Sequence, residues 1–186
     1  MSQIHVCPLA HVDAVLAASR AGWAVSLLVL PHRVPAFPGV APERRLHLAL
    51  SDIVQATPSY VLAEQRHIDD LLAFLACWDR AEPMLIHCYA GVSRSTAAAF
   101  IALCCLVPDV TEDTHARRLR AASPTATPNR HLVALADAAL RRNGRMVEAV
   151  AAIGRGAECF EGTCFALDLE DAPATGALDG RPPMPA

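Results

Sequence analysis

The residues best suited to chemistry are a cysteine and an arginine that are separated by five residues. Cys88 and Arg94 belong to the segment His87–Ser95, which follows the apolar run Pro83–His87 and precedes an alanine-rich stretch. A strand, a loop and a helix in this order place backbone N–H groups around one small anion. The loop therefore suits a tetrahedral oxyanion, and the same positive field favours the Cys88 thiolate. Gly91 permits the sharp turn, and Arg94 offers a planar fork of donors that lysine lacks.

This segment resembles the signature HCxxGxxR[S/T] of the cysteine-dependent protein tyrosine phosphatase superfamily, and in particular its small dual-specificity branch. Every fixed position of the signature is present. The similarity spans about Leu46 to Leu140, is greatest to small bacterial members, and includes a weaker match of Arg120–Asn129 to an R…PN segment. The resemblance implies a general acid on a loop a few tens of residues before the cysteine. Asp52 lies 36 residues before Cys88, just after an expected strand.

The resemblance also implies a role for each residue of the loop. The Cys88 thiolate would attack phosphorus and form a phosphocysteine, while Asp52 would protonate the leaving oxygen and later activate water. Ser95 would donate a hydrogen bond to the sulfur, and His87 would support the loop. The phosphoryl oxygens would be bound by the arginine and the loop amides, namely by Tyr89, Ala90, Gly91, Val92, Ser93 and Arg94.

The function implied is that of a protein tyrosine phosphatase, or a dual-specificity one, acting on a phosphorylated protein or a small phosphomonoester. Two other classes stay open. A rhodanese-type sulfurtransferase also uses a cysteine in an anion-binding loop, although that loop is usually one residue shorter and has no use for Asp52. A noncatalytic phosphopeptide-binding module usually lacks the nucleophile or the acid, and this chain has both. The preference between phosphotyrosine and phosphoserine or phosphothreonine does not follow from the sequence.

Individual residues also have simpler interpretations. Cys88 could be a buried structural thiol, but Arg94 and Gly91 would then be coincidences. Asp52 could be a turn or N-cap residue, and its rivals as the acid lie on an expected helix: Asp69, Asp70 and Asp79. Tyr89 could stack beside a substrate or line the rim of the loop. No metal and no cofactor is expected, because the chain has no CxxC or HxxxH pair beside His87 and Cys88.

The chain contains seven cysteines, an odd number that leaves at least one thiol unpaired. Cys7, Cys104 or Cys105 could protect an oxidised Cys88 by forming a disulfide. Four cysteines are expected to be small core residues: Cys7, Cys77, Cys104 and Cys105. Cys159 and Cys164 have no assignment.

The elements that position this loop alternate between strand and helix, which predicts an α/β fold. We expect a small, mostly parallel central sheet flanked by helices, as in dual-specificity phosphatases, with a helical C-terminal half. Strands are expected at Ile4–Leu9, Trp23–Leu30, Leu46–Leu50 and Pro83–His87. Helices are expected at Val12–Ala21, Val61–Asp79, Ser95–Leu106 and Thr111–Ala122, then from N-cap Thr127 and Pro128 to Arg142, and from Arg145. Proline and glycine predict a loop from Pro31 to Arg45.

The domain is expected to comprise residues 1–155, followed by a C-terminal extension at 156–186. Within the extension, Phe160–Leu169 could form a strand or an extended arm, and the last part is expected to be disordered because it has few large apolar residues.

Composition excludes several partners. Sixteen basic and 19 acidic residues give a net charge of -3, which does not suit nucleic acid or an anionic membrane. The apolar run Ala97–Val107 is too short to span a bilayer. The N-terminal segment MSQIHVCPLAH has no secretory pattern, so a cytoplasmic location is expected. The oligomeric state is left open.

Overall fold

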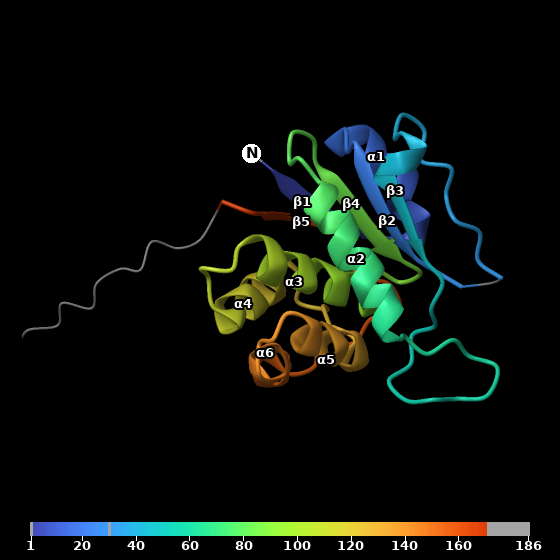
Figure 1. The fold of residues 1–186 in the computed structure, drawn as a ribbon. Coiled ribbons are helices and arrows are strands. Elements are labelled where there is room, and N and C mark those ends of the chain that lie inside the picture. Colours follow the sequence, from blue (N-terminus) through green and yellow to red (C-terminus); the bar gives the residue numbers. More distant parts are fainter. Residues whose placement is uncertain (1, 30, 171–186) are drawn as a thin grey trace, which may run out of the picture.

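The computed structural model describes residues 2–29 and 31–170, and its described part is organised around a five-stranded sheet. The strand order is β3-β2-β4-β1-β5, in which β1 to β4 are parallel and β5 is antiparallel to β1. The expected mostly parallel sheet is therefore confirmed. The strands are β1 Gln3–Pro8, β2 Trp23–Leu27, β3 Arg45–Leu48, β4 Met84–Cys88 and β5 Phe165–Asp168; they are labelled in Figure 1.

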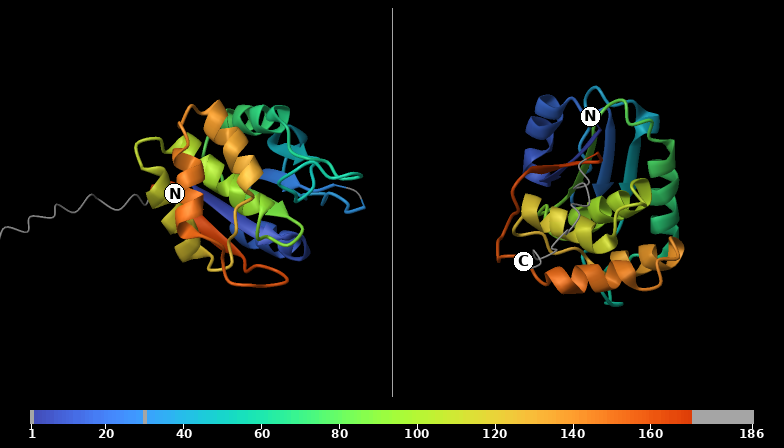
Figure 2. Two further views of the ribbon diagram at one scale, coloured as in Figure 1. Left: turned by 90° about the horizontal axis from the view of Figure 1, so that it is seen from below. Right: turned by 90° about the vertical axis from the view of Figure 1, so that its left-hand side faces the viewer.

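Helices cover both faces of the sheet, as Figure 2 shows. On one face, α1 packs together with Phe37 and Val40 of the proline-rich loop after β2. On the other face, α3 is buried from Arg94 to Cys104. The enclosure of α3 explains why its sequence is apolar on every side. The helices are α1 Val12–Ser19, α2 Gln65–Cys77, α3 Arg94–Leu106, α4 Glu112–Ala122, α5 Arg130–Ala139 and α6 Arg145–Ile153, with 3₁₀ turns at Leu9–His11 and Pro42–Arg44.

The expected start of α2 at Val61 is wrong, because Val61 is tied to the segment that leaves β3. Its carbonyl accepts from the Ser51 amide at 2.8 Å, and its amide donates to Ser51 Oγ at 3.1 Å. The helix begins instead at Gln65, where Glu64 and His67 form a reciprocal capping box. Residues 51–61 are thereby left as a loop beside the end of β3.

The expected N-cap of α5 at Thr127 is also wrong. Asn129 takes this position, because its Oδ1 accepts from the amides of His131 and Leu132, each at 3.1 Å. The helix ends at Ala139, before Arg142, since Arg141 adopts a left-handed backbone conformation with φ of 54°. β2 likewise ends early, at Leu27; its expected end, Leu30, lies outside the described residues.

β5 brings part of the expected C-terminal extension into the sheet. Phe165–Asp168 pairs with Gln3–Val6, and Gln3 Nε2 donates to Asp168 Oδ1 at 2.8 Å. Of the two alternatives for this segment, the structure contains the strand. The expected disorder concerns residues 170–186, of which 171–186 lie outside the described part. Among the described helices, none has the length and apolar character needed to cross a bilayer.

Candidate active site

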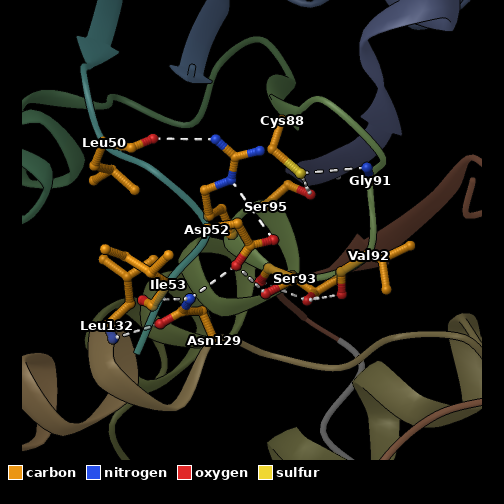
Figure 3. A network of polar contacts seen from close by, with 12 residues as sticks. Leu50, Asp52, Ile53, Cys88, Gly91, Val92, Ser93, Ser95, Asn129 and Leu132 are labelled. Carbon is orange, nitrogen blue, oxygen red and sulfur yellow. Dashed lines mark hydrogen bonds and ion pairs between the residues drawn. The ribbon is translucent and has the colours of Figure 1, made fainter. Parts of the chain in front are cut away.

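The Cys88 side chain lies at the end of β4, where the chain enters the loop that leads into α3. Its sulfur is almost completely buried and lies 3.1 Å from Ser95 Oγ. The Gly91 amide donates to the same sulfur at 3.3 Å, as Figure 3 shows. Two hydrogen-bonding groups therefore face the sulfur, one from the loop and one from the first turn of α3. The structure thus brings together Cys88, Gly91 and Ser95 as the spacing of the loop predicted.

The carbonyl groups of this loop are bound by the segments around it. The Tyr89 carbonyl accepts from the Leu9 amide at 3.0 Å, and the Ala90 carbonyl accepts from the Gly162 amide at 2.8 Å. The Val92 carbonyl accepts from the Thr127 amide at 2.9 Å. Carbonyls that turn outward leave the N–H groups of the loop for the inner side, which is the requirement for binding an anion.

Gly91 is required at its position for two separate reasons. Its φ of 70° lies in the left-handed region. A Cβ atom at this residue would also lie only 2.7 Å from the backbone nitrogen of Pro8 and 3.0 Å from the carbonyl carbon of Cys7. The loop therefore rests directly on the end of β1, and no side chain fits between them.

Arg94 begins α3, and its guanidinium is buried beside the loop. Nη1 donates to the Leu50 carbonyl at 3.1 Å, and Nε lies 3.8 Å from Asp52 Oδ2. Nε makes no hydrogen bond within the described part of the chain. Burying a cation with an unsatisfied N–H donor costs free energy. A bound oxyanion would accept from this donor and so satisfy the Arg94 side chain.

Asp52 lies on the loop after β3, at the edge of the same cluster. Its Oδ1 accepts from Ser93 Oγ at 2.7 Å and from Asn129 Nδ2 at 2.9 Å, and its side chain is 37% exposed. The carboxyl group is thus anchored on one side and open to solvent on the other. The rival aspartates lie elsewhere: Asp69 and Asp70 are exposed on α2, and Asp79 pairs with Arg44 beyond its end.

Asn129 is the residue of this site that the sequence interpretation missed. It was recognised only as the last residue of the R…PN segment. In the structure its amide nitrogen donates to both Asp52 and the Ile53 carbonyl, while its amide oxygen caps α5 (Figure 3). The asparagine in that motif was the available signal, although nothing in it indicated Asp52 as the partner.

The variable residues of the loop lie on two sides: Tyr89 forms part of the exposed rim, whereas Ala90 and Val92 lie against Gly162. Tyr89 is 42% exposed, and its ring lies 4.4 Å from that of His32, which belongs to the proline-rich loop. Val92 and Ala90 lie on the side facing Gly162. An open cavity of about 340 Å³ adjoins the site and is bordered by Asp52, Ser93, Asn129, Arg130 and Arg155, among others.

His87 is buried on the opposite face of β4 from Cys88, as neighbouring strand residues must be. Its ring centroid lies 5.7 Å from that of Phe37, and burial lowers its pKa to about 4. The ring therefore has no access to the site. Among residues 2–29 and 31–170, no group of three or more His, Cys, Asp or Glu side chains is arranged to hold a metal ion.

The thiols considered as partners for Cys88 are not placed to reach it. Ser95 contacts the sulfur, and Cys104 lies nine residues farther along α3, about 14 Å at 1.5 Å per residue. Cys105 lies one residue beyond. Cys7 belongs to the apolar cluster on the α1 face, whereas Cys88 belongs to the cluster on the other face. A disulfide requires a much shorter separation than that of Cys104, and it requires side chains directed toward each other, which Cys7 and Cys88 on opposite faces of the sheet are not.

Comparison with solved structures identifies this fold as that of the tyrosine and dual-specificity phosphatases. The Cydia pomonella PTP-2 phosphatase superposes with a TM-score of 0.55 at 18% identity, over 73% of this chain and 84% of that one. DUSP15 gives 0.56 at 15% identity, over 81% and 89%. Human DUSP28 gives 0.53 at 21% identity, over 80% and 94%. No protein-family model and no curated protein matches the sequence. The predicted resemblance is confirmed at the level of the fold. The greater similarity to bacterial members stays a prediction.

Proposed function

We propose that this protein is a cysteine-dependent phosphatase that hydrolyses phosphotyrosine, and also phosphoserine or phosphothreonine, through a phosphocysteine intermediate. The observation that carries the proposal is one cluster of groups with complementary roles. A buried sulfur accepts a hydrogen bond from the Gly91 amide and shares another with Ser95 Oγ, a buried guanidinium keeps an unused donor, and a partly exposed carboxyl group lies beside that guanidinium.

In the first step, the Cys88 sulfur attacks phosphorus and the bond from phosphorus to the leaving oxygen breaks. Asp52 supplies the proton that this oxygen needs. The N–H groups of Tyr89, Ala90, Gly91, Val92 and Ser93, together with Arg94, bind the three remaining oxygens, where preorganised donors contribute most.

In the second step, water attacks phosphorus and the bond to sulfur breaks, releasing inorganic phosphate. Asp52, now a carboxylate, takes the proton from the water. Ser95 Oγ, 3.1 Å from the sulfur, stabilises the departing thiolate. Asn129 and Ser93 hold Asp52 during both steps, and His87 supports the loop from the other face of the sheet.

The surroundings of the loop support this substrate class. Tyr89 and His32 give the rim an aromatic wall, which suits the ring of phosphotyrosine. The adjoining cavity leaves room for the polypeptide or the remainder of a small phosphomonoester. A cytoplasmic location, where thiols stay reduced, is part of this proposal.

Turnover of an aryl phosphate under reducing conditions tests the proposal. Cys88→Ser should abolish turnover, and Asp52→Asn should lower kcat by about 10²-fold or more. Cys159→Ser is the matched control, because Cys159 is an exposed cysteine of the tail and its loss should leave turnover unchanged. Equal rates for the protein and Cys88→Ser would refute the phosphatase proposal.

The same preparations separate the alternatives. Thiosulfate-dependent formation of thiocyanate, without phosphatase activity, would indicate a sulfurtransferase. Phosphopeptide binding by the intact protein without turnover would indicate a noncatalytic module. Matched peptides carrying phosphotyrosine or phosphoserine then measure the preference between the two as a ratio of kcat/KM.

A further inference from the structure

Cys7 and Cys164 lie next to the last residue pair of the antiparallel β1–β5 ladder, Cys7 within β1 and Cys164 just before β5. The antiparallel register pairs Ile4 with Leu167, His5 with Ala166, and Val6 with Phe165. Continued by one residue, this register would set Cys7 opposite Cys164. Residues directly opposite in an antiparallel pair point to the same face of the sheet, so both thiols are directed to the α1 face.

The surroundings of the two sulfurs agree with this placement. Cys7 is fully buried in the apolar cluster beneath α1, and Cys164 is exposed at the sheet edge. Cys164 also borders an open cavity with His5 and Val15. Burial raises the pKa of the Cys7 thiol to about 12, and the nearby Cys164 thiolate adds to this shift, followed by that of Cys88. Burial, followed by the charge of Glu161, likewise raises the pKa of the Cys164 thiol.

We infer that Cys7 and Cys164 form a disulfide when the folded protein meets a peroxide. Directly opposed residues of antiparallel strands have Cα atoms about 4.5 or 5.5 Å apart, and disulfides span Cα separations of about 4.4–6.8 Å. A continued β1–β5 register would therefore meet the Cα separation that a disulfide requires. This inference is independent of the proposed phosphatase activity, because neither thiol belongs to the site around Cys88.

The chemistry takes place in two balanced steps. The exposed Cys164 sulfur attacks one oxygen of hydrogen peroxide, the O–O bond breaks, and a sulfenic acid and water result. The Cys7 sulfur then attacks the Cys164 sulfur, the S–O bond breaks, and the hydroxyl group leaves as water with the Cys7 proton. Two thiols and one peroxide thereby give one disulfide and two waters: the two sulfur atoms are oxidised and the peroxide oxygens are reduced.

The disulfide would join two segments that support the loop around Cys88. Pro8, next to Cys7, contacts Gly91, and Gly162, two residues before Cys164, donates to the Ala90 carbonyl at 2.8 Å. The link would also close a loop of more than 150 residues between Cys7 and Cys164. Such a constraint lowers the entropy of the unfolded chain, so the oxidised protein should be more stable than the reduced one.

Peptide mapping after peroxide treatment tests the inference directly. Folded protein is treated with hydrogen peroxide, remaining thiols are alkylated, and linked peptides are identified by mass spectrometry. A Cys7–Cys164 link should form, should disappear on reduction, and should be absent from Cys164→Ser. Cys159→Ser, which removes the neighbouring exposed cysteine, should retain it.

Two results would overturn the inference. One is a Cys164 link to Cys159 or Cys88 in place of Cys7, and the other is a Cys7–Cys164 link that forms only in denaturant. As a second measurement, the thermal midpoint of the oxidised protein should exceed that of the reduced protein by about 5 °C or more, and Cys164→Ser should show no such difference. An unchanged midpoint in a fully linked sample would contradict the proposed placement of the pair in the folded sheet.

Discussion

Replacing Gly91 by alanine separates two effects that the structure assigns to one residue. A left-handed φ costs an alanine about 1–2 kcal/mol. The added Cβ would also lie 2.7 Å from the Pro8 nitrogen, and this contact involves backbone on both sides, so it cannot be relieved by a side-chain rotation. Overpacking of this kind adds about 1–3 kcal/mol. We expect Gly91→Ala to destabilise the protein by about 2–5 kcal/mol in total.

Gly39→Ala is the matched control for this experiment. Gly39 has a φ of 85°, but no atom lies within 4 Å of the position that its Cβ would occupy. It therefore reports only the backbone strain, about 1–2 kcal/mol. Denaturant unfolding of both variants gives the contribution of the contact with Pro8 as the difference between them.

Activity provides the second measurement on the same pair. If Gly91→Ala relieves its contact by moving the loop, the amides shift relative to Cys88, and kcat/KM for an aryl phosphate should fall by about 10²-fold. Gly39→Ala should keep the activity of the parent. Equal stability losses for the two variants, or near-parental activity in folded Gly91→Ala, would refute the reasoning that β1 fixes the loop.

Three further predictions concern other residues of the site. Asn129→Ala should lower kcat by about 10-fold with little change in KM, because Asp52 loses one of its two hydrogen-bond donors. Asn129→Asp keeps the α5 cap but sets a second carboxylate beside Asp52, so it should lower kcat at least as much. Parental kcat in either variant would contradict the positioning role. Arg94→Lys should lower kcat/KM by about 10²-fold or more despite the retained charge, since a lysine has no planar fork, and rescue by guanidinium ion would support this explanation. Burial lowers the pKa of His87 from 6.5 to about 4 in the folded protein, so this ring takes up a proton more readily in the unfolded chain. The free energy of unfolding should therefore fall by about 3 kcal/mol as the pH drops from about 6.5 to about 4. His87→Asn should lose less stability over this pH range in chemical denaturation, and an equal loss would contradict the assignment of the effect to His87.

The loop around Cys88 could be predicted because its determinants are local. Nine consecutive residues contain the nucleophile, the turn glycine, the arginine and the hydroxyl group, and the flanking strand and helix follow from adjacent apolar runs. Asp52 could be proposed because the family resemblance implies an acid a few tens of residues before the cysteine, and Asp52 lies at that distance just after an expected strand.

Features that depend on contacts between residues far apart in the sequence could not be predicted from local patterns. Asn129 donates to a residue 77 positions away, and Thr127 satisfies the N-cap preferences as well as Asn129 does. Val61 fits the apolar period of α2, yet its hydrogen bonds to Ser51 exclude it from the helix. The antiparallel direction of β5 has no signature in its own few residues, because orientation depends on where the preceding helices leave the chain.

The position of β5 also has a consequence for the order in which the molecule folds. The outer edge of β1 stays unpaired until Phe165–Asp168 has arrived, and the Gln3–Asp168 contact spans 165 positions of the chain. Contacts of such long range form slowly. An unpaired edge strand meanwhile offers its N–H and C=O groups to any other chain. β1, which precedes the other described strands in the chain, is therefore covered late, and intermediates in which β5 has not docked leave its edge open to aggregation.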